Sequence, residues 1–349
     1  MTGREDRPWR ALAPAVLCLL LLAASCARQG EAPNGASAPA PNAAGSVPAA
    51  EAMKVGLLVT GPVNDDGWNQ IAWEGLQRIE KELGAQISHQ LTERAEQFEE
   101  GFRGYARQGY RLVFGHGAEF SDAIARVAPE FPDTIFVSTG GRTALANAAP
   151  LNAAMEEATY LLGILAAGVS KTGKAGQIGG TELPPVKKAF DAFVAGAKSV
   201  NPSFEVTTQY VGSWTNANAA KEMALARIRQ GADILFPNAD AAGLGVFQAV
   251  KENQAKGVFA FGANKNQNDI APEVILASAV MDVPEMFLRL AREVKEGAFK
   301  GEPHRYGMKD GVISLVMNPA LEAKIPAATR QKVEEAKQGI EAGTLKVDG

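Results

Sequence analysis

The segment "GHGAEFSDA", residues 115–123, carries the side chains of this sequence best suited to chemistry. His116, Ser121 and Asp122 are the residue types of a hydrolytic triad, and His116 with Glu119 or Asp122 offers metal ligands. A triad serine of the α/β-hydrolase kind sits in a G-x-S-x-G turn, which this segment lacks. The chain has only three histidines, and no two are spaced i, i+4 as in a zinc-binding helix.

The glycine-rich segments do not supply nucleotide-binding chemistry either. No G-x-x-x-x-G-K-[ST] phosphate loop occurs, and "VGLLVTG" is no dinucleotide fingerprint. We therefore expect no catalytic residue, no bound metal and no cofactor, which leaves an enzyme as the weakest of the alternatives.

Two tryptophans stand where a packed core does not require them. Trp68 lies in "GPVNDDGWNQ" and Trp214 in "YVGSWTNAN", each after an apolar run and before a helical pattern. One interpretation is that each ring packs over its own loop. The other is that the two rings sandwich a flat ligand, where each stacking contact contributes roughly 1–3 kcal/mol. Trp73 lies within a helical pattern, so we expect it to pack.

Apolar runs alternate with helical patterns along the chain. The predicted strands cover residues 53–61, 110–117, 133–140, 174–180, 204–212, 232–240, 257–264 and 274–280. The predicted helices cover residues 69–83, 121–127, 155–169, 186–198, 217–230 and 244–253. This alternation predicts an α/β protein with parallel sheets. Ligands of such folds bind beyond the carboxyl ends of the strands.

Polar and aromatic residues gather at those predicted strand ends. Asparagine both donates and accepts hydrogen bonds, whereas ionised aspartate only accepts, and a purine edge needs both kinds of contact. The candidate ligand-binding residues are Asn64, Asp65, Trp68, Asn69, Phe120, Asp122, Trp214, Asn238, Asp240, Gly243 and Asn264.

The beginning of the chain predicts export and lipidation. Arg4, Arg7 and Arg10 precede an apolar run over residues 11–22, and "LAASC" ends in Cys26. This run is too short to span a bilayer, which needs about 20 residues. Residues 1–25 resemble a lipoprotein signal peptide whose cysteine receives the lipid. The alternative is an ordinary signal peptide followed by an accidental cysteine.

Composition limits what the rest of the chain can be. Residues 26–52 are rich in Ala, Pro, Gly and Ser, which predicts a disordered tether. The remaining ~300 residues favour two lobes. The formal net charge is −4 without a strongly basic stretch, which argues against nucleic acid as a partner. Cys18 and Cys26 are the only cysteines, so the mature domain has no disulfide.

An ordered set of segments resembles the basic membrane protein family, solute-binding lipoproteins related to purine nucleoside receptor A. The resemblance runs from about Lys54 to the region of Gly311. Its segments are "DDGWNQIAWEGL", "FGHGAEFSDA", "EEATYLLGILAA", "GGTELPPVKKAFDAFVAGAK", "YVGSW" and "GADILF…GLGVFQAVKE". The resemblance implies the type I periplasmic-binding-protein fold, with two doubly wound parallel-sheet lobes joined by three hinge crossings.

We expect the first lobe to comprise residues 53–153 with 264–298, and the second to comprise residues 154–263 with 299–349. The resemblance further implies binding without catalysis, delivery of the solute to the permease of an ABC importer, and a monomer outside the cytoplasm.

The resemblance also assigns residues. Two phenylalanines that stack on the base in relatives match Trp68 and Trp214, and positions that contact base or ribose match Asn69 and Asp122. Relatives carry an Asp in "GVD" and a Lys in "SMVK" that reach the ribose; here these segments read "FGAN" and "SAVM", giving Asn264 and Met281. Losing both charges together avoids a buried unpaired charge, and predicts a weaker demand for ribose.

The sequence therefore predicts a membrane-anchored binding protein for a purine nucleoside or a purine base. One alternative is a binding protein for another flat heterocycle, such as a flavin. Another is a ligand-sensing lipoprotein that is not coupled to an importer.

Overall fold

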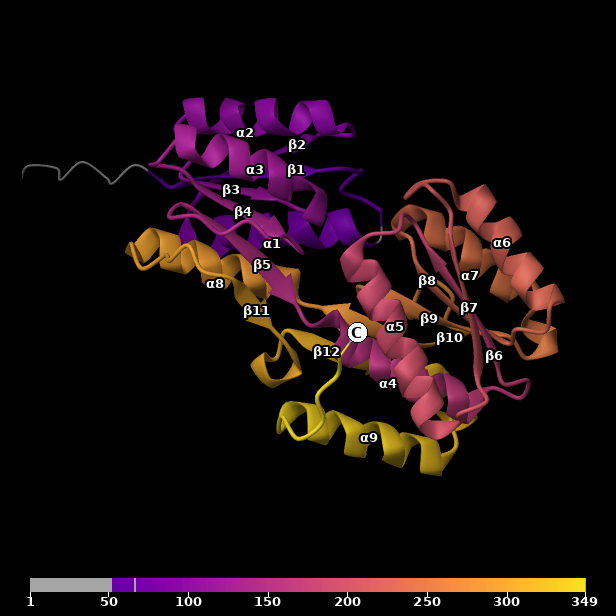
Figure 1. The fold of residues 1–349 in the computed structure, drawn as a ribbon. Coiled ribbons are helices and arrows are strands. Elements are labelled where there is room, and N and C mark those ends of the chain that lie inside the picture. Colours follow the sequence, from indigo (N-terminus) through magenta and orange to yellow (C-terminus); the bar gives the residue numbers. More distant parts are fainter. Residues whose placement is uncertain (1–51, 66, 349) are drawn as a thin grey trace, which may run out of the picture. The chain divides into compact units, whose positions relative to one another are not determined.

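The computed structural model describes residues 52–65 and 67–348, which belong to one unit of the chain, residues 50–349. The predicted signal peptide, Cys26 and nearly all of the predicted tether lie outside the described residues. Two six-stranded sheets organise the described part (Figure 1).

The first sheet has the strand order β11-β5-β4-β3-β1-β2, and all of its neighbouring strands are parallel. Its strands are β1 (Lys54–Val59), β2 (Gln86–Leu91), β3 (Leu112–Gly115), β4 (Ile135–Thr139), β5 (Ala148–Ala153) and β11 (His304–Tyr306). In β1, "KVGLLV", every residue after Lys54 is buried, as expected for a strand covered on both faces.

The second sheet has the order β12-β10-β9-β8-β6-β7 and is parallel except where β12 pairs with β10. Its strands are β6 (Lys174–Gly179), β7 (Glu205–Tyr210), β8 (Ile234–Asn238), β9 (Phe259–Asn264), β10 (Ile275–Met281) and β12 (Ile313–Met317). Two mostly parallel sheets with flanking helices confirm the predicted fold class.

Helices connect most consecutive strands, as in βαβ units, although in the described part of the chain none lies between β4 and β5 or between β9 and β10. They are α1 (Trp68–Leu83), α2 (Phe98–Arg107), α3 (Ser121–Val127), α4 (Met155–Val169), α5 (Pro184–Val200), α6 (Ala217–Arg229), α7 (Gly243–Glu252), α8 (Val283–Glu296) and α9 (Ala327–Glu341). Short 3₁₀ turns that matter below are η2 (Ala118–Phe120), η4 (Asp240–Ala242) and η6 (Met308–Asp310).

The chain passes between the two sheets three times. The crossings follow β5, β10 and β11. The lobe ranges expected from the sequence differ from this strand pairing. Residues 264–281 lead into and form β10, which pairs with β9 of the second sheet, whereas β11 pairs with β5 of the first. An apolar pattern indicates a strand but not its partner, so the sequence could not place these two crossings.

Helices α4 and α5 pack closely against each other through two glycines. A Cβ on Gly163 would lie 2.1 Å from the Phe193 carbonyl oxygen, and one on Gly196 would lie 2.0 Å from the Tyr160 carbonyl oxygen. Any larger residue at either position would force the helices apart. Helix α4 follows β5, where the chain leaves the first sheet, and it precedes β6 of the second sheet. The contact with α5 therefore positions the segment that leads into the second sheet.

Helix α8 returns to the first sheet and packs beside α1 (Figure 1). Phe287 stacks on Phe114 of β3 with ring centroids 3.9 Å apart, and a Cβ on Gly75 of α1 would lie 2.9 Å from the Phe287 ring. This buried contact explains why α8 belongs with the first sheet although its preceding strand belongs to the second.

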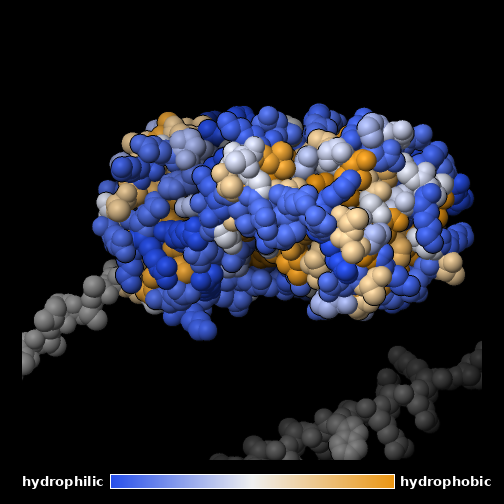
Figure 2. Space-filling view, turned by 90° about the horizontal axis from the view of Figure 1, so that it is seen from below, coloured by the Kyte–Doolittle hydropathy of each residue, from blue (hydrophilic) through white to orange (hydrophobic). Residues whose placement is uncertain are grey.

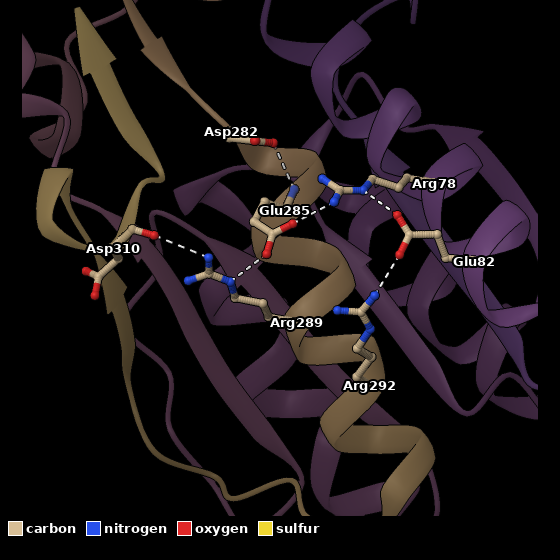
Figure 3. Close-up of polar contacts among 7 residues, drawn as sticks. All are labelled: Arg78, Glu82, Asp282, Glu285, Arg289, Arg292 and Asp310. Atoms are coloured by element: carbon tan, nitrogen blue, oxygen red, sulfur yellow. Dashed lines mark hydrogen bonds and ion pairs between the residues drawn. The ribbon is translucent and has the colours of Figure 1, made fainter.

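Charged side chains surround the α1–α8 contact (Figure 3). Arg78 bridges Glu82 and Glu285, each at 2.8 Å, and Arg289 connects Glu285 to the carbonyl of Asp310 in η6. These ion pairs are partly exposed, so they contribute little to stability compared with the buried Phe287 ring.

The surface has few exposed large hydrophobic groups. Figure 2 shows a face on which hydrophilic residues predominate and hydrophobic residues stand between them in small groups. Within residues 52–65 and 67–348, the exposed large hydrophobic side chains are Leu91 and Leu145. In the same part of the chain, no helix has both the length and the apolar character to cross a membrane.

Candidate functional site

A cavity of about 520 Å³ opens at the carboxyl ends of strands from both sheets, the place where ligands bind in open α/β sheets. The first sheet contributes Thr60 after β1, Gly117 after β3, Thr139 at the end of β4 and Asn152 in β5. The second sheet contributes the terminal residues of β8, β9 and β10. These are Asn238, Asn264 and Met281.

Trp68 and Trp214 both line this cavity. The first is the first residue of α1, and the second lies in the loop between β7 and α6. One ring therefore comes from each half of the structure, which is the arrangement that the sandwich interpretation required.

The ring of Trp68 is held by His116 in three ways. The two rings stack with centroids 3.9 Å apart and planes inclined by 24°. The indole Nε1 donates to the His116 carbonyl at 3.2 Å, and His116 Nε2 lies 2.9 Å from the Trp68 carbonyl. The other imidazole nitrogen, Nδ1, lies 2.8 Å from the hydroxyl of Thr139.

His116 is consequently a structural residue and not a base or a ligand of a metal. It is fully buried, and burial lowers its pKa to about 3, against a small opposing effect of the Trp68 carbonyl. Both ring nitrogens are engaged, Ser121 bonds to Ser138, and Asp122 pairs with Arg142 at 2.6 Å. No triad forms in the "GHGAEFSDA" segment, and among the described residues no three potential ligands gather in a metal-binding group.

Trp214 is supported by a glycine. A Cβ on Gly180 would lie 2.1 Å from its Cε3 atom, so the indole lies directly on the backbone after β6. The backbone carbonyl of Trp214 accepts a hydrogen bond at 2.9 Å from the N–H of Ala242, the last residue of η4. Gly180 is thus required for the close approach of the ring.

Asp65 and Asn69 form a helix cap instead of lining the cavity. The Asp65 carboxylate accepts the backbone N–H groups of Gly67, Asn69 and Gln70 at 3.0–3.1 Å, and the Asn69 amide at 2.7 Å. The N-cap residue of α1 is Gly67, and Asp65, two residues earlier, satisfies unpaired N–H groups at the start of the helix. The expectation that these two residues contact the ligand is therefore corrected: they fix the position of Trp68.

Three further candidates also lie elsewhere. Asn64 is exposed and outside the cavity. Phe120 is fully buried and packs against Phe98, with centroids 4.3 Å apart, because the η2 turn directs it into the core. Gly243 begins α7 and is not in the cavity wall, but it borders a narrow gap beneath Asp240.

The remaining candidates are in the wall, as expected: Asp122, Asn238, Asp240 and Asn264. The Asn264 amide donates to the Asn238 side-chain oxygen at 3.4 Å. Asp240 and Asn264 are the non-glycine residues with left-handed backbone in the described part, at φ 48° and 67°. Asp and Asn tolerate this conformation better than other residues, and such positions cluster at functional sites.

Two carboxyl groups at the cavity resist ionisation. Burial, followed by the charges of Asp65 and Glu119, raises the pKa of Asp240 well above its usual range. Burial also raises the pKa of Glu119, against opposing hydrogen bonds from its own backbone and the Thr60 side chain. Sequence reasoning considered Glu119 only as a metal ligand, although its place after β3 is the same signal that identified its neighbours.

An ion triad around a buried carboxylate was missed entirely. Glu156, at the start of α4, is 3% exposed and pairs with Lys188 of α5, at 2.9 Å, and with Arg305 of β11. Burial alone would raise its pKa, but these two partners lower it. All three residues line the cavity. No short motif could reveal them, because they come from three distant segments.

Fold and site together define a solute-binding protein of the type I fold, and sequence comparison gives the same class. The family of ABC transporter substrate-binding proteins described as PnrA-like matches residues 52–346. The chain belongs to this family of substrate-binding proteins.

Individual relatives agree. The chain is 29% identical over 304 residues to a purine-binding protein of Brucella abortus (strain 2308), covering 86% of this chain and 84% of the relative. It is 30% identical over 292 residues to the ABC transporter nucleoside-binding protein BmpA of Lactococcus lactis, covering 78% and 83%. A crystal structure of a solute-binding protein from Aeropyrum pernix K1 has the same fold, with a TM-score of 0.78 at 24% identity, covering 84% and 92%.

The buried neutral imidazole of His116 predicts a specific pH dependence of stability. An unfolded chain protonates histidine near pH 6.5, whereas the folded protein does so only near pH 3. Between these values the unfolded state binds the extra proton, so the free energy of unfolding falls with falling pH, by up to about 1.4 kcal/mol per unit. The replacement His116→Gln should lower stability at pH 7 and remove this contribution to the slope.

Urea denaturation of the wild type and of His116→Gln between pH 4 and 7 measures how the free energy of unfolding of each changes with pH. This range covers most of the interval between the pKa values of the folded and unfolded states. His89→Gln, at an exposed histidine of β2, is the matched control and should keep the wild-type slope. Equal slopes for wild type and His116→Gln would contradict the assignment.

Proposed function

We propose that this protein binds a purine base or a purine nucleoside in the 520 Å³ cavity, between Trp68 and Trp214, and delivers it to the permease of an ABC importer. The observation that carries the proposal is the pair of indoles, one from each half of the structure, in the wall of one cavity. Flat ring systems stack on such surfaces, and neighbouring amides and carboxyls supply directional contacts. The volume lies in the range typical of small-molecule sites.

The family relationship supports the same ligand class, since one relative is a purine-binding protein and another a nucleoside-binding protein. We further propose that each sheet with its helices acts as one lobe, and that the lobes close on the ligand as a monomer. A flavin-like heterocycle would stack as well, but it would need more space than one purine.

The stacking proposal predicts a specific pattern among tryptophan variants. Trp68→Ala and Trp214→Ala should each weaken purine binding by ~1–3 kcal/mol, about 5- to 150-fold, because each removes one stacking surface. Trp73→Ala is the control: Trp73 lies on α1 as well, but it packs against His89, outside the cavity. Titration calorimetry, with quenching of tryptophan fluorescence as a second signal, measures the effect. Unchanged affinity in both cavity variants would exclude the sandwich.

The polar residues at the ends of β9 and β10 predict a weak preference for ribose. Asn264 and Met281 line the cavity and are nearly buried; a methionine offers no hydrogen-bond donor, and an asparagine offers no charge. Hydrogen bonds to charged groups contribute about 1.5–3 kcal/mol each. Without them, we expect the protein to prefer a nucleoside over its free base by less than about tenfold, or to prefer the base.

The double replacement Asn264→Asp with Met281→Lys should shift this preference toward the nucleoside. Aspartate tolerates the left-handed backbone at residue 264, and the two new charges neutralise each other. Each single replacement buries an unpaired charge and should help less. Calorimetry with adenosine, adenine, guanosine and guanine gives the ratios. A wild-type preference for nucleosides of a hundredfold or more would show that other residues hold the ribose.

We also propose that Cys26 carries a lipid that anchors the protein on the outer side of the bacterial membrane, in the periplasm of a Gram-negative cell. A single acyl chain binds weakly, whereas two or more anchor firmly. Cys26→Ser should release a soluble protein that still binds ligand, since the residues that line the cavity lie between Thr60 and Arg305. Membrane fractionation decides the matter, and wild-type protein found wholly in the soluble fraction would refute the anchor.

A further inference from the structure

The hydrogen bonds around His116 determine where its proton lies. The Trp68 carbonyl can only accept a hydrogen bond, so the imidazole Nε2, at 2.9 Å, must carry the hydrogen. A neutral imidazole has one N–H, and burial keeps this ring neutral. Its Nδ1 is therefore an acceptor, and the Thr139 hydroxyl at 2.8 Å must donate to it.

Because the Thr139 hydroxyl donates to His116, it cannot also donate a hydrogen bond to a ligand. The residue lines the cavity and is 2% exposed, and no second side-chain partner competes for its hydroxyl among the described hydrogen bonds. Its single hydroxyl proton is used toward His116, so only oxygen lone pairs remain for the cavity. A ligand N–H satisfies them, whereas a ligand carbonyl would place two acceptors against each other.

The groups beside Thr139 carry both donors and acceptors. Glu119 lies in the same wall, and because burial raises its pKa, its neutral carboxyl can donate as well as accept a hydrogen bond. The cationic side chains of the cavity pair with carboxylates, Arg142 with Asp122, and Lys188 and Arg305 with Glu156, and each keeps further N–H donors. In the wall formed by the ends of β3 and β4, the Thr139 hydroxyl is therefore the group whose hydrogen-bonding direction His116 fixes.

We propose that Thr139 is a specificity-determining residue that selects purines bearing an exocyclic amino group over the corresponding oxo purines, and that His116 is the positioning residue that orients the Thr139 hydroxyl. The proposal rests on the purine-binding function proposed above. The same imidazole supports the Trp68 ring, so one side chain sets both the stacking surface and the polarity of the adjacent wall.

A matched series of bases tests the selectivity. Adenine, 2-aminopurine and 2,6-diaminopurine carry amino groups, whereas purine and hypoxanthine do not. Since one good hydrogen bond and the avoided clash each change binding several-fold, we expect the best amino purine to bind wild-type protein at least about tenfold more tightly than hypoxanthine. Calorimetry at pH 7 measures each affinity.

Two variants connect this preference to the Thr139 hydroxyl. Thr139→Val keeps the shape but removes the hydroxyl, and should reduce the preference for the amino purine to less than about threefold. Thr139→Ser keeps the hydroxyl and should retain the preference. Thr143→Val is the control, because Thr143 donates to the Ser121 carbonyl and does not line the cavity; it should behave as wild type.

A measurement without ligand tests the directions of the hydrogen bonds that His116 makes with Trp68 and Thr139. Nitrogen-15 NMR of the His116 ring distinguishes the Nε2–H tautomer, which we expect from pH 5 to pH 9, from the Nδ1–H tautomer. Observation of Nδ1–H would overturn the proposal, because Thr139 would then accept from His116 and donate to the ligand.

The outcomes separate the two proposals. Purine binding with no preference for amino groups, or a preference that survives in Thr139→Val, overturns the role of Thr139 and leaves purine binding intact. No binding of any purine overturns both. Selective binding that is lost in Thr139→Val and kept in Thr139→Ser, together with the Nε2–H tautomer, supports both.

Discussion

The contact between Trp68 and His116 is the interaction on which the binding site depends. Trp68 begins the helix that follows β1, and His116 directly follows β3. These strands are parallel neighbours, so their carboxyl ends lie side by side. The two rings stack, and the ring of each residue donates a hydrogen bond to the backbone carbonyl of the other. Because a partly exposed indole without such support would sample several rotamers, this contact holds the Trp68 side chain in one position as a fixed surface.

Neighbouring residues also fix the positions of the two cavity tryptophans. Asp65 caps α1 directly at Trp68, so the helix begins where the ring must be placed. On the opposite side, Gly180 lets Trp214 approach the backbone closely. Neither ring is held by a flexible loop alone. Such preorganisation lowers the entropy lost when a ligand binds.

The electrostatics of the cavity differ from end to end. Near Asp240 and Glu119, burial raises the carboxyl pKa values, and the charges there are of one sign. Around Glu156, two cations hold the pKa of a buried carboxyl low and join α4, α5 and β11 close to the chain crossings. Neutral carboxyls in the first region can donate and accept hydrogen bonds, whereas in the second region two cations share one carboxylate and join α4, α5 and β11.

Strand-end reasoning predicted much of the site because parallel topology fixes where loops gather. It placed Trp68, Trp214, Asn238, Asp240 and Asn264 at one cleft, and all five line the cavity. It could not distinguish a side chain in the cavity from a cap, such as Asp65, or from a core ring, such as Phe120, because these depend on local turns. The polar edge strand β2 and the three-residue β11 have no apolar pattern to detect. The sequence placed α8 with the first half of the chain, but it could not place β10 in the second sheet or β11 in the first, because their partner strands lie elsewhere in the chain.

A crystal structure of the protein with the purine that binds most tightly would test the central claim most directly. The account predicts one ring system between the indoles of Trp68 and Trp214, parallel to both at a stacking separation of about 3.5–4 Å, with its polar edge toward Thr139. A purine bound outside this cavity, or in contact with only one of the two indoles, would contradict it.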